Sequence, residues 1–142
     1  MINAKAIGLA RARDLHQTII SGTIFNMWPE IACRRGWRLM GEALVTDDPN
    51  DNYPDIVIKD ERKRLVFSLE ITRRSSISYD RRKCLILQQR FPWAEFYIYN
   101  YETDILYSLG EDGQWYNSQE YEITSRLFER PLLEYIYVPE EY

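Results

Sequence analysis

Two acidic residues, Asp55 and Glu70, belong to a stretch whose pattern predicts two short strands joined by a charged turn. The apolar runs 56–58 and 65–71 flank residues 60–64, and so short a linker favours an antiparallel hairpin. That pairing places the start of the first strand beside the end of the second, which brings Asp55 and Glu70 together. Two neighbouring carboxylates typically share a hard divalent cation such as Mg²⁺.

Glu70 is the more informative of the two acids because it interrupts an apolar strand. It stands between Leu69 and Ile71, so one face of the strand must accept a charge that is costly to bury without a partner. The alternative to a metal is an ion pair with Arg73, Arg74 or Lys83. For Asp55, after Pro54, the alternative is a turn cap.

Other reactive side chains have weaker support. The single histidine, His16, is predicted on the surface of an N-terminal helix, so nucleophilic catalysis that depends on histidine has little basis. Cys33 and Cys84 lie far apart with no Cys or His at ligand spacing. We therefore expect buried free thiols rather than a zinc site.

The elements that must position these residues follow from periodicity. Helices are predicted over 4–20 and 23–35, with Ser21-Gly22 interrupting them, and over about 78–90. Strands are predicted on either side of that last helix, at 37–45, 56–58, 65–71, 94–101, 104–109 and 114–117. Strands bounded by helices predict an α/β (α+β) domain with one central mixed sheet flanked by helices.

Length and composition set the class of protein. The 142 residues are 45% hydrophobic and 14% aromatic, which predicts one globular domain: a helical part at 1–35, a core at 36–109 and an acidic C-terminal extension at 110–142. Residues 1–100 carry a net charge of +4 and residues 101–142 one of −8. No apolar run approaches a membrane span, so we expect a cytoplasmic protein without a membrane partner.

The motif Pro54-Asp55 … Glu70-Ile71-Thr72 resembles that of the PD-(D/E)XK nuclease superfamily. Within it, the chain is most similar to the Uma-type restriction endonucleases. That likeness rests on the segments that follow the hairpin, which are 79–83, 94–99, 104–107 and 113–116. It covers roughly Gly36 to the C-terminus and implies a restriction-endonuclease-like fold, with Asp55 and Glu70 binding Mg²⁺, or Mn²⁺ in its place.

One position departs from the superfamily pattern, which has lysine where this chain has Thr72. A threonine cannot supply a positive charge to the reacting phosphate. Lys83 and Arg73 are the candidates to replace it, and we favour Lys83, because the helix after the Glu70 strand can direct its first turns toward the strand's end. Superfamily members often add a glutamate from the first helix. Glu30 fits that role, with an ordinary surface position as the alternative, and Glu42 has no better case.

The resemblance implies a metal-dependent endonuclease that acts on DNA, with Asp55, Glu70 and Lys83 as catalytic residues. Four arginines near the acids are the expected nucleic-acid contacts, and these are Arg73, Arg74, Arg81 and Arg82. The alternative is an inactive protein of the same fold that binds nucleic acid or serves as an interaction subunit. Possible partners are therefore DNA, a second copy in a homodimer, and a protein bound by the acidic C-terminal part.

Overall fold

A six-stranded mixed sheet forms the centre of the protein. The computed structural model describes the backbone of residues 4–140 and the side chains of residues 14–140. The strands lie in the sheet in sequence order, and every neighbouring pair is antiparallel except β3 and β4, which are parallel. They are β1 (Arg38–Gly41), β2 (Ile56–Lys59), β3 (Leu65–Thr72), β4 (Glu95–Asn100), β5 (Ile105–Leu109) and β6 (Trp115–Asn117).

The predicted hairpin is confirmed as β2 and β3, in the interior of the sheet. Its turn is closed by the buried Asp60, whose Oδ1 accepts hydrogen bonds from the backbone N–H groups of Arg62 and Arg64 at 2.9 and 3.0 Å. Asp60 Oδ2 accepts a further bond from Arg64 Nε at 2.9 Å. Asp60 therefore holds part of the basic turn in place. This turn helps to fix the register between β2 and β3.

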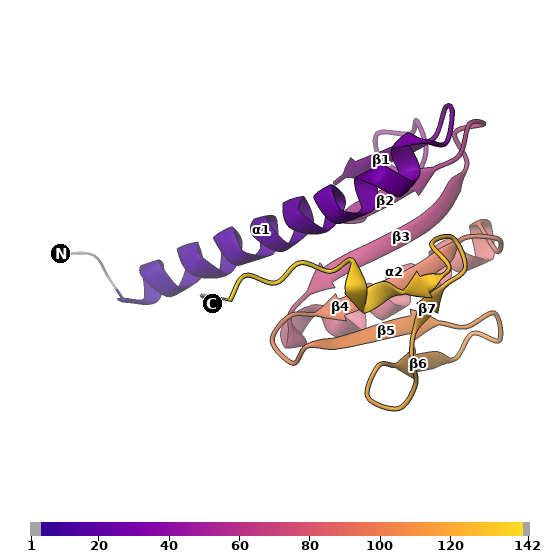
Figure 1. The fold of residues 1–142 in the computed structure, drawn as a ribbon. Helices are drawn as coiled ribbons and strands as arrows, with labels where there is room; N and C mark the ends of the chain where they lie inside the picture. The colour runs from indigo at the N-terminus through magenta and orange to yellow at the C-terminus, as the bar shows by residue number, and fades with distance from the viewer. Residues whose placement is uncertain (1–3, 141–142) are drawn as a thin grey trace.

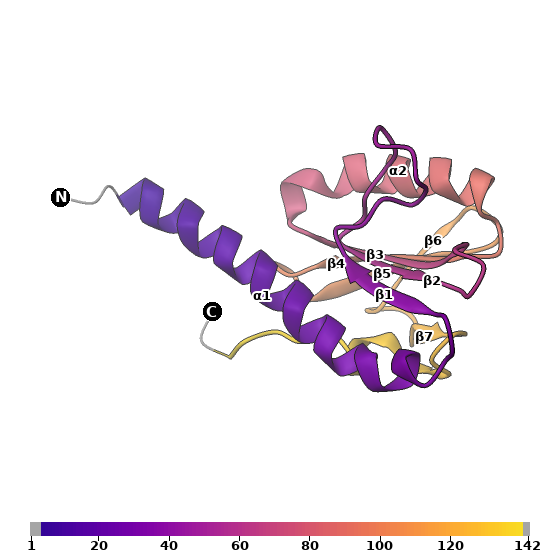
Figure 2. The same ribbon diagram turned by 90° about the horizontal axis from the view of Figure 1, so that it is seen from above.

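Helix α2 (Ile77–Arg90) makes the crossover that the parallel pair β3–β4 requires. It follows the 3₁₀ turn η1 (Arg74–Ser76) and buries Asp80, Cys84 and Leu87, which are spaced at i, i+4 and i+7 on one helix face. This helix and strand β4 agree with the prediction to within two residues. Figure 2 shows α2 covering one face of the sheet.

Helix α1 (Ala4–Ala32) lies on the opposite face, and it is one continuous helix of 29 residues. The predicted break at Ser21-Gly22 is wrong. Glycine is needed at position 22 for close packing, because an added Cβ would overlap the ring of Tyr137 in the C-terminal segment. The N-terminal part of α1 extends beyond the sheet (Figures 1 and 2).

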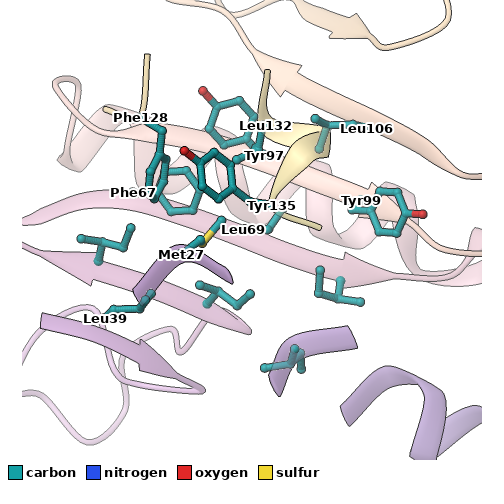
Figure 3. Packing of buried hydrophobic residues seen from close by; sticks show 14 of the residues in the cluster. Met27, Leu39, Phe67, Leu69, Tyr97, Tyr99, Leu106, Phe128, Leu132 and Tyr135 are labelled. Atoms are coloured by element: carbon teal, nitrogen blue, oxygen red, sulfur yellow. The ribbon is translucent and has the colours of Figure 1, made fainter. Parts of the chain in front are cut away.

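The predicted acidic C-terminal extension is integrated into this face of the fold. Beyond β6 it forms a small ribbon of β7 (Thr124–Ser125) and β8 (Arg130–Pro131), followed by the 3₁₀ turn η2 (Leu132–Glu134). Figure 3 shows its aromatic residues packed against the sheet. The Phe128 ring lies 5.7 Å from Phe67 and 4.6 Å from Tyr135, measured between ring centroids.

The first strand is shorter than predicted, since β1 ends at Gly41 rather than at Val45. Glu42 has a positive φ of 50°, which breaks the strand, and its N–H bonds to the Asp55 carbonyl at 2.9 Å. Among the described residues, no helix is long and apolar enough to cross a membrane.

Candidate active site

Asp55 and Glu70 line one cavity of about 420 Å³ beside the C-terminal end of β3. The hairpin register explains why the two acids lie close together. Ile56 and Leu69 are the last paired residues of β2 and β3, and one residue further along each strand Asp55 lies opposite Glu70. Asp55 is anchored by its Oδ2, which accepts the backbone N–H of Ile71 at 2.8 Å. We call this space the acid cavity.

Glu70 is buried, with 6% of its surface exposed, and its Oε1 accepts a hydrogen bond from Lys83 Nζ at 2.9 Å. Burial, and then the negative charge of Asp55, raise the pKa of Glu70 to about 7 although Lys83 opposes the change. Burial alone would lower the pKa of Lys83, but the charge and hydrogen bond of Glu70 outweigh it and the pKa is raised. Lys83 therefore stays charged, while Glu70 gains and loses a proton near neutral pH.

Asp80 is a third acid on the cavity wall, which was not predicted from the sequence. It lies in the first turn of α2 and is 8% exposed. Burial raises the pKa of its carboxyl, while Thr72 and Lys83 act in the opposite direction. The missed signal was its spacing, since Asp80 shares a helix face with Lys83, Cys84 and Leu87 at i+3, i+4 and i+7.

His16 is also part of this site, so its prediction as a surface residue is wrong. From the half-buried side chain, Nε2 lies 2.9 Å from the carbonyl oxygen of Ile71 and 3.3 Å from Asp55 Oδ2. The hydrogen bond with Asp55 raises the pKa of His16, against the effect of burial. Its position three and four residues before the buried Ile19 and Ile20 would have indicated an inward face.

The four predicted nucleic-acid contacts are placed differently from one another. Arg73 is exposed and lines the acid cavity, and Arg74 and Arg82 are exposed. The guanidinium of Arg81 instead stacks on sheet aromatics, 4.8 Å from the centroid of Tyr107 and 5.6 Å from that of Trp115. Arg81 is half-buried and does not line the cavity, so it serves packing rather than the site.

Two further acids lie away from the cavity. Glu30 accepts a hydrogen bond from the Tyr135 hydroxyl at 2.5 Å. It is fourteen residues from His16 along α1, a separation of about 21 Å at a rise of roughly 1.5 Å per residue. Glu42 is exposed and accepts a hydrogen bond from Gln17 Nε2 at 3.1 Å. The structure therefore does not bring Glu30 to Asp55 and Glu70.

Both cysteines are free thiols, but only Cys84 is buried, and the expectation of burial is wrong for Cys33. Cys33 lies in the turn after α1, where its Sγ donates to the Glu30 carbonyl at 3.2 Å. Cys84 lies on the inner face of α2, and burial raises the pKa of its thiol far above the usual range. Cys84 is therefore unsuited to act as a nucleophile, and Cys33 does not line the acid cavity.

The donor set of the acid cavity suits a magnesium-type cation better than zinc. Among the residues with described side chains, no three or more His, Cys, Asp or Glu side chains form a group that could hold a metal. Magnesium needs fewer protein ligands, because it binds through one or two carboxylates and keeps several water ligands. Among the residues with described side chains, the hydrogen bonds to the two carboxylates end on Asp55 Oδ2 and Glu70 Oε1. The second carboxylate oxygen of each residue is therefore left to bind such an ion.

Comparison with known proteins does not assign the chain to a family. Models of known protein families give no match to the sequence, and a search of curated proteins gives no significant match.

Proposed function

We propose that the chain is a metal-dependent phosphodiesterase of the endonuclease type that acts on DNA and has a restriction-endonuclease-like fold. One observation carries the proposal: Glu70 is buried beside Asp55 in an open cavity, at a cost that raises its pKa to about 7. A buried carboxyl group with a strongly raised pKa is typical of functional sites. A solvated surface ion pair would not require such burial.

In this proposal Asp55 and Glu70 hold a Mg²⁺ ion, for which Mn²⁺ can substitute. Such an ion, when bound, lowers the pKa of a water ligand and neutralises phosphate charge. Lys83 provides the positive charge that Thr72 cannot, and its hydrogen bond to Glu70 fixes where that charge lies. Arg73, which is exposed where it lines the cavity, is placed to contact a phosphate of the bound strand.

The second candidate is a protein of the same fold that binds nucleic acid, or another protein, without cleaving it. Two observations favour it. Thr72 stands where the superfamily motif has lysine, and the Lys83 ammonium is already paired with Glu70. A closed ion pair can satisfy a buried acid without any metal.

Cleavage assays separate the two candidates. We expect the wild-type chain to cut plasmid or linear DNA with Mg²⁺ or Mn²⁺ and not with EDTA. Glu70→Ala should abolish cleavage, and Lys83→Ala should reduce it by about 10²- to 10³-fold, as for loss of one charge-stabilising group. DNA binding by Lys83→Ala should be nearly unchanged. The exposed Glu61→Ala is the matched control and should cleave normally.

Other results would reject the enzyme. Cleavage that neither Glu70→Ala nor Lys83→Ala alters would come from a contaminant or another site. No cleavage of any DNA or RNA, together with salt-sensitive binding that Arg73→Ala weakens, would establish the binding protein instead.

A further inference from the structure

The opening of the acid cavity is bordered by aromatic side chains as well as by a cation. Tyr79, in the first turn of α2, is 64% exposed, and Tyr101, just after β4, is half-buried. Both line the cavity together with Arg73, whose charge acts on the Tyr101 hydroxyl. The cavity therefore combines acids that are buried, a cation that is exposed and two phenol rings.

Packing does not account for the position of Tyr79. Other tyrosines are held by contacts: Tyr97 and Tyr99 are buried and donate hydrogen bonds to acids at 2.5 Å. Within residues 14–140, Tyr79 takes part in none of the aromatic pairs or side-chain hydrogen bonds found. A single exposed tyrosine is ordinary on a protein surface. What distinguishes Tyr79 is that its exposed ring belongs to the wall of the acid cavity.

The depth of the acids restricts the form of nucleic acid that can reach them. Glu70 is only 6% exposed, so a phosphate must enter the cavity to approach it. The cavity, at about 420 Å³, has the size of a pocket for a small ligand rather than of a groove for a helix. Bases in a duplex are stacked on one another, whereas an unpaired base presents a free face on which a tyrosine can stack.

From these features we propose that the nucleic acid bound at this site is an unpaired DNA strand, such as a single-stranded end or flap. A base stacks on Tyr79 while Arg73 contacts a neighbouring phosphate. This inference rests on the proposed function, because it specifies the substrate class of the same site. It assigns Tyr79 as a specificity-determining residue.

Fluorescence anisotropy tests the inference without requiring cleavage. The probes are a fluorescein-labelled 12-nucleotide oligothymidine and its duplex with oligodeoxyadenosine, in buffer with Ca²⁺. We expect the single strand to bind at least about 10-fold more tightly than the duplex. Tyr79→Ala should weaken single-strand binding by about 5- to 150-fold, the range for loss of one stacked base. Tyr79→Phe keeps the ring and should bind within about twofold of wild type.

The matched control is Tyr121→Ala, which removes another exposed tyrosine, at 53%, from outside the acid cavity. It should bind both probes as wild type does. Thermal melts of the Tyr79 variants should coincide with that of wild type because the Tyr79 ring is exposed, whereas Tyr121→Ala loses its edge-on contact with Tyr116, 5.4 Å between ring centroids, and should melt slightly lower. Equal affinity for single strand and duplex, no binding of either probe, or a Tyr79→Ala effect no larger than that of Tyr121→Ala would overturn the inference.

The inference and the proposed function fail in different ways. If the chain cuts duplex DNA with Mg²⁺ and Tyr79→Ala leaves both cleavage and binding unchanged, the nuclease stands and the inference is wrong. If single-strand binding depends on Tyr79 but no substrate is cut, the specificity stands and the enzyme is rejected.

Discussion

Replacing Glu70 with glutamine should make the protein more stable at alkaline pH while abolishing cleavage. Glutamine resembles the protonated acid in shape, so the variant keeps the neutral form of the side chain at every pH. In the wild type, burial and the charge of Asp55 hold the pKa of Glu70 at about 7, above the ordinary 4.5. The ionised form is therefore less stable in the folded protein than in the unfolded chain.

The size of the effect follows from this pKa difference. Each pKa unit corresponds to roughly 1.4 kcal/mol, so the increase from 4.5 to about 7 amounts to about 3 kcal/mol of folding free energy. Because the folded pKa is the higher one, the folded state binds more protons between these two values. Wild-type stability attributable to Glu70 therefore falls as pH rises from 4.5 to about 7, and is constant above that.

Urea denaturation at pH 4, 6 and 8 measures the difference between variant and wild type. We expect Glu70→Gln to equal the wild type near pH 4 and to exceed it by up to about 3 kcal/mol at pH 8. The exposed Glu61→Gln should follow the wild type at every pH. Mg²⁺ at ten times its dissociation constant should stabilise the wild type at pH 8 by about 1.4 kcal/mol and leave Glu70→Gln almost unchanged.

The opposite outcome would refute this reasoning. If Glu70→Gln is less stable than the wild type at pH 8, the ion pair with Lys83 contributes more than the burial of Glu70 costs. Glu70 would then be a structural residue, and the raised pKa would carry no argument for a metal site.

Three further predictions concern other parts of the molecule. His16→Ala should lower the free energy of unfolding by about 1.5 to 3 kcal/mol at pH 6 and by less at pH 9 in urea titrations, because the raised pKa of His16 gives stability that is lost as pH rises through its folded value. Gly22→Ala should cost about 1 to 3 kcal/mol, because its Cβ would overlap Tyr137, and Tyr137→Ala in the same chain should remove most of that cost. In the native protein Cys33 should react rapidly with a thiol reagent monitored by absorbance, and Cys84 only after unfolding; equal rates would contradict its burial.

Much of the fold could be predicted from sequence because its signals are local. The hairpin was indicated by two apolar runs with a charged linker, and α2 by a periodic stretch ending before Pro92. The break at Gly22 was a local signal that tertiary packing overrode. A glycine inside a helix costs about 1 kcal/mol, and close packing of the C-terminal segment at that point accounts for its presence.

The composition of the site was only partly predictable, because local sequence signals do not reveal contacts between residues far apart in the chain. Asp55 and Glu70 are joined by a hairpin, so sixteen residues of chain were enough to place them side by side. The contact between His16 and Ile71 spans 55 residues and depends on how α1 crosses the sheet. Asp80 is close in sequence, but its role follows from the face of α2 that packs on β3 and β4, which becomes visible only once those strands are paired.

In the proposed enzyme, Thr72 at the position of the superfamily lysine would change which element supplies the cation. At position 72 a lysine would share a strand face with Glu70, two residues away. We propose that α2 supplies Lys83 instead, and the same helix face adds Asp80. Apart from the exposed Arg73 on the cavity wall, three carboxylates, those of Asp55, Glu70 and Asp80, stand against one ammonium, which leaves two negative charges when all are ionised and His16 is neutral. A divalent cation would balance that charge, so we expect Mg²⁺ to lower the pKa values of Glu70 and Asp80 toward their ordinary range.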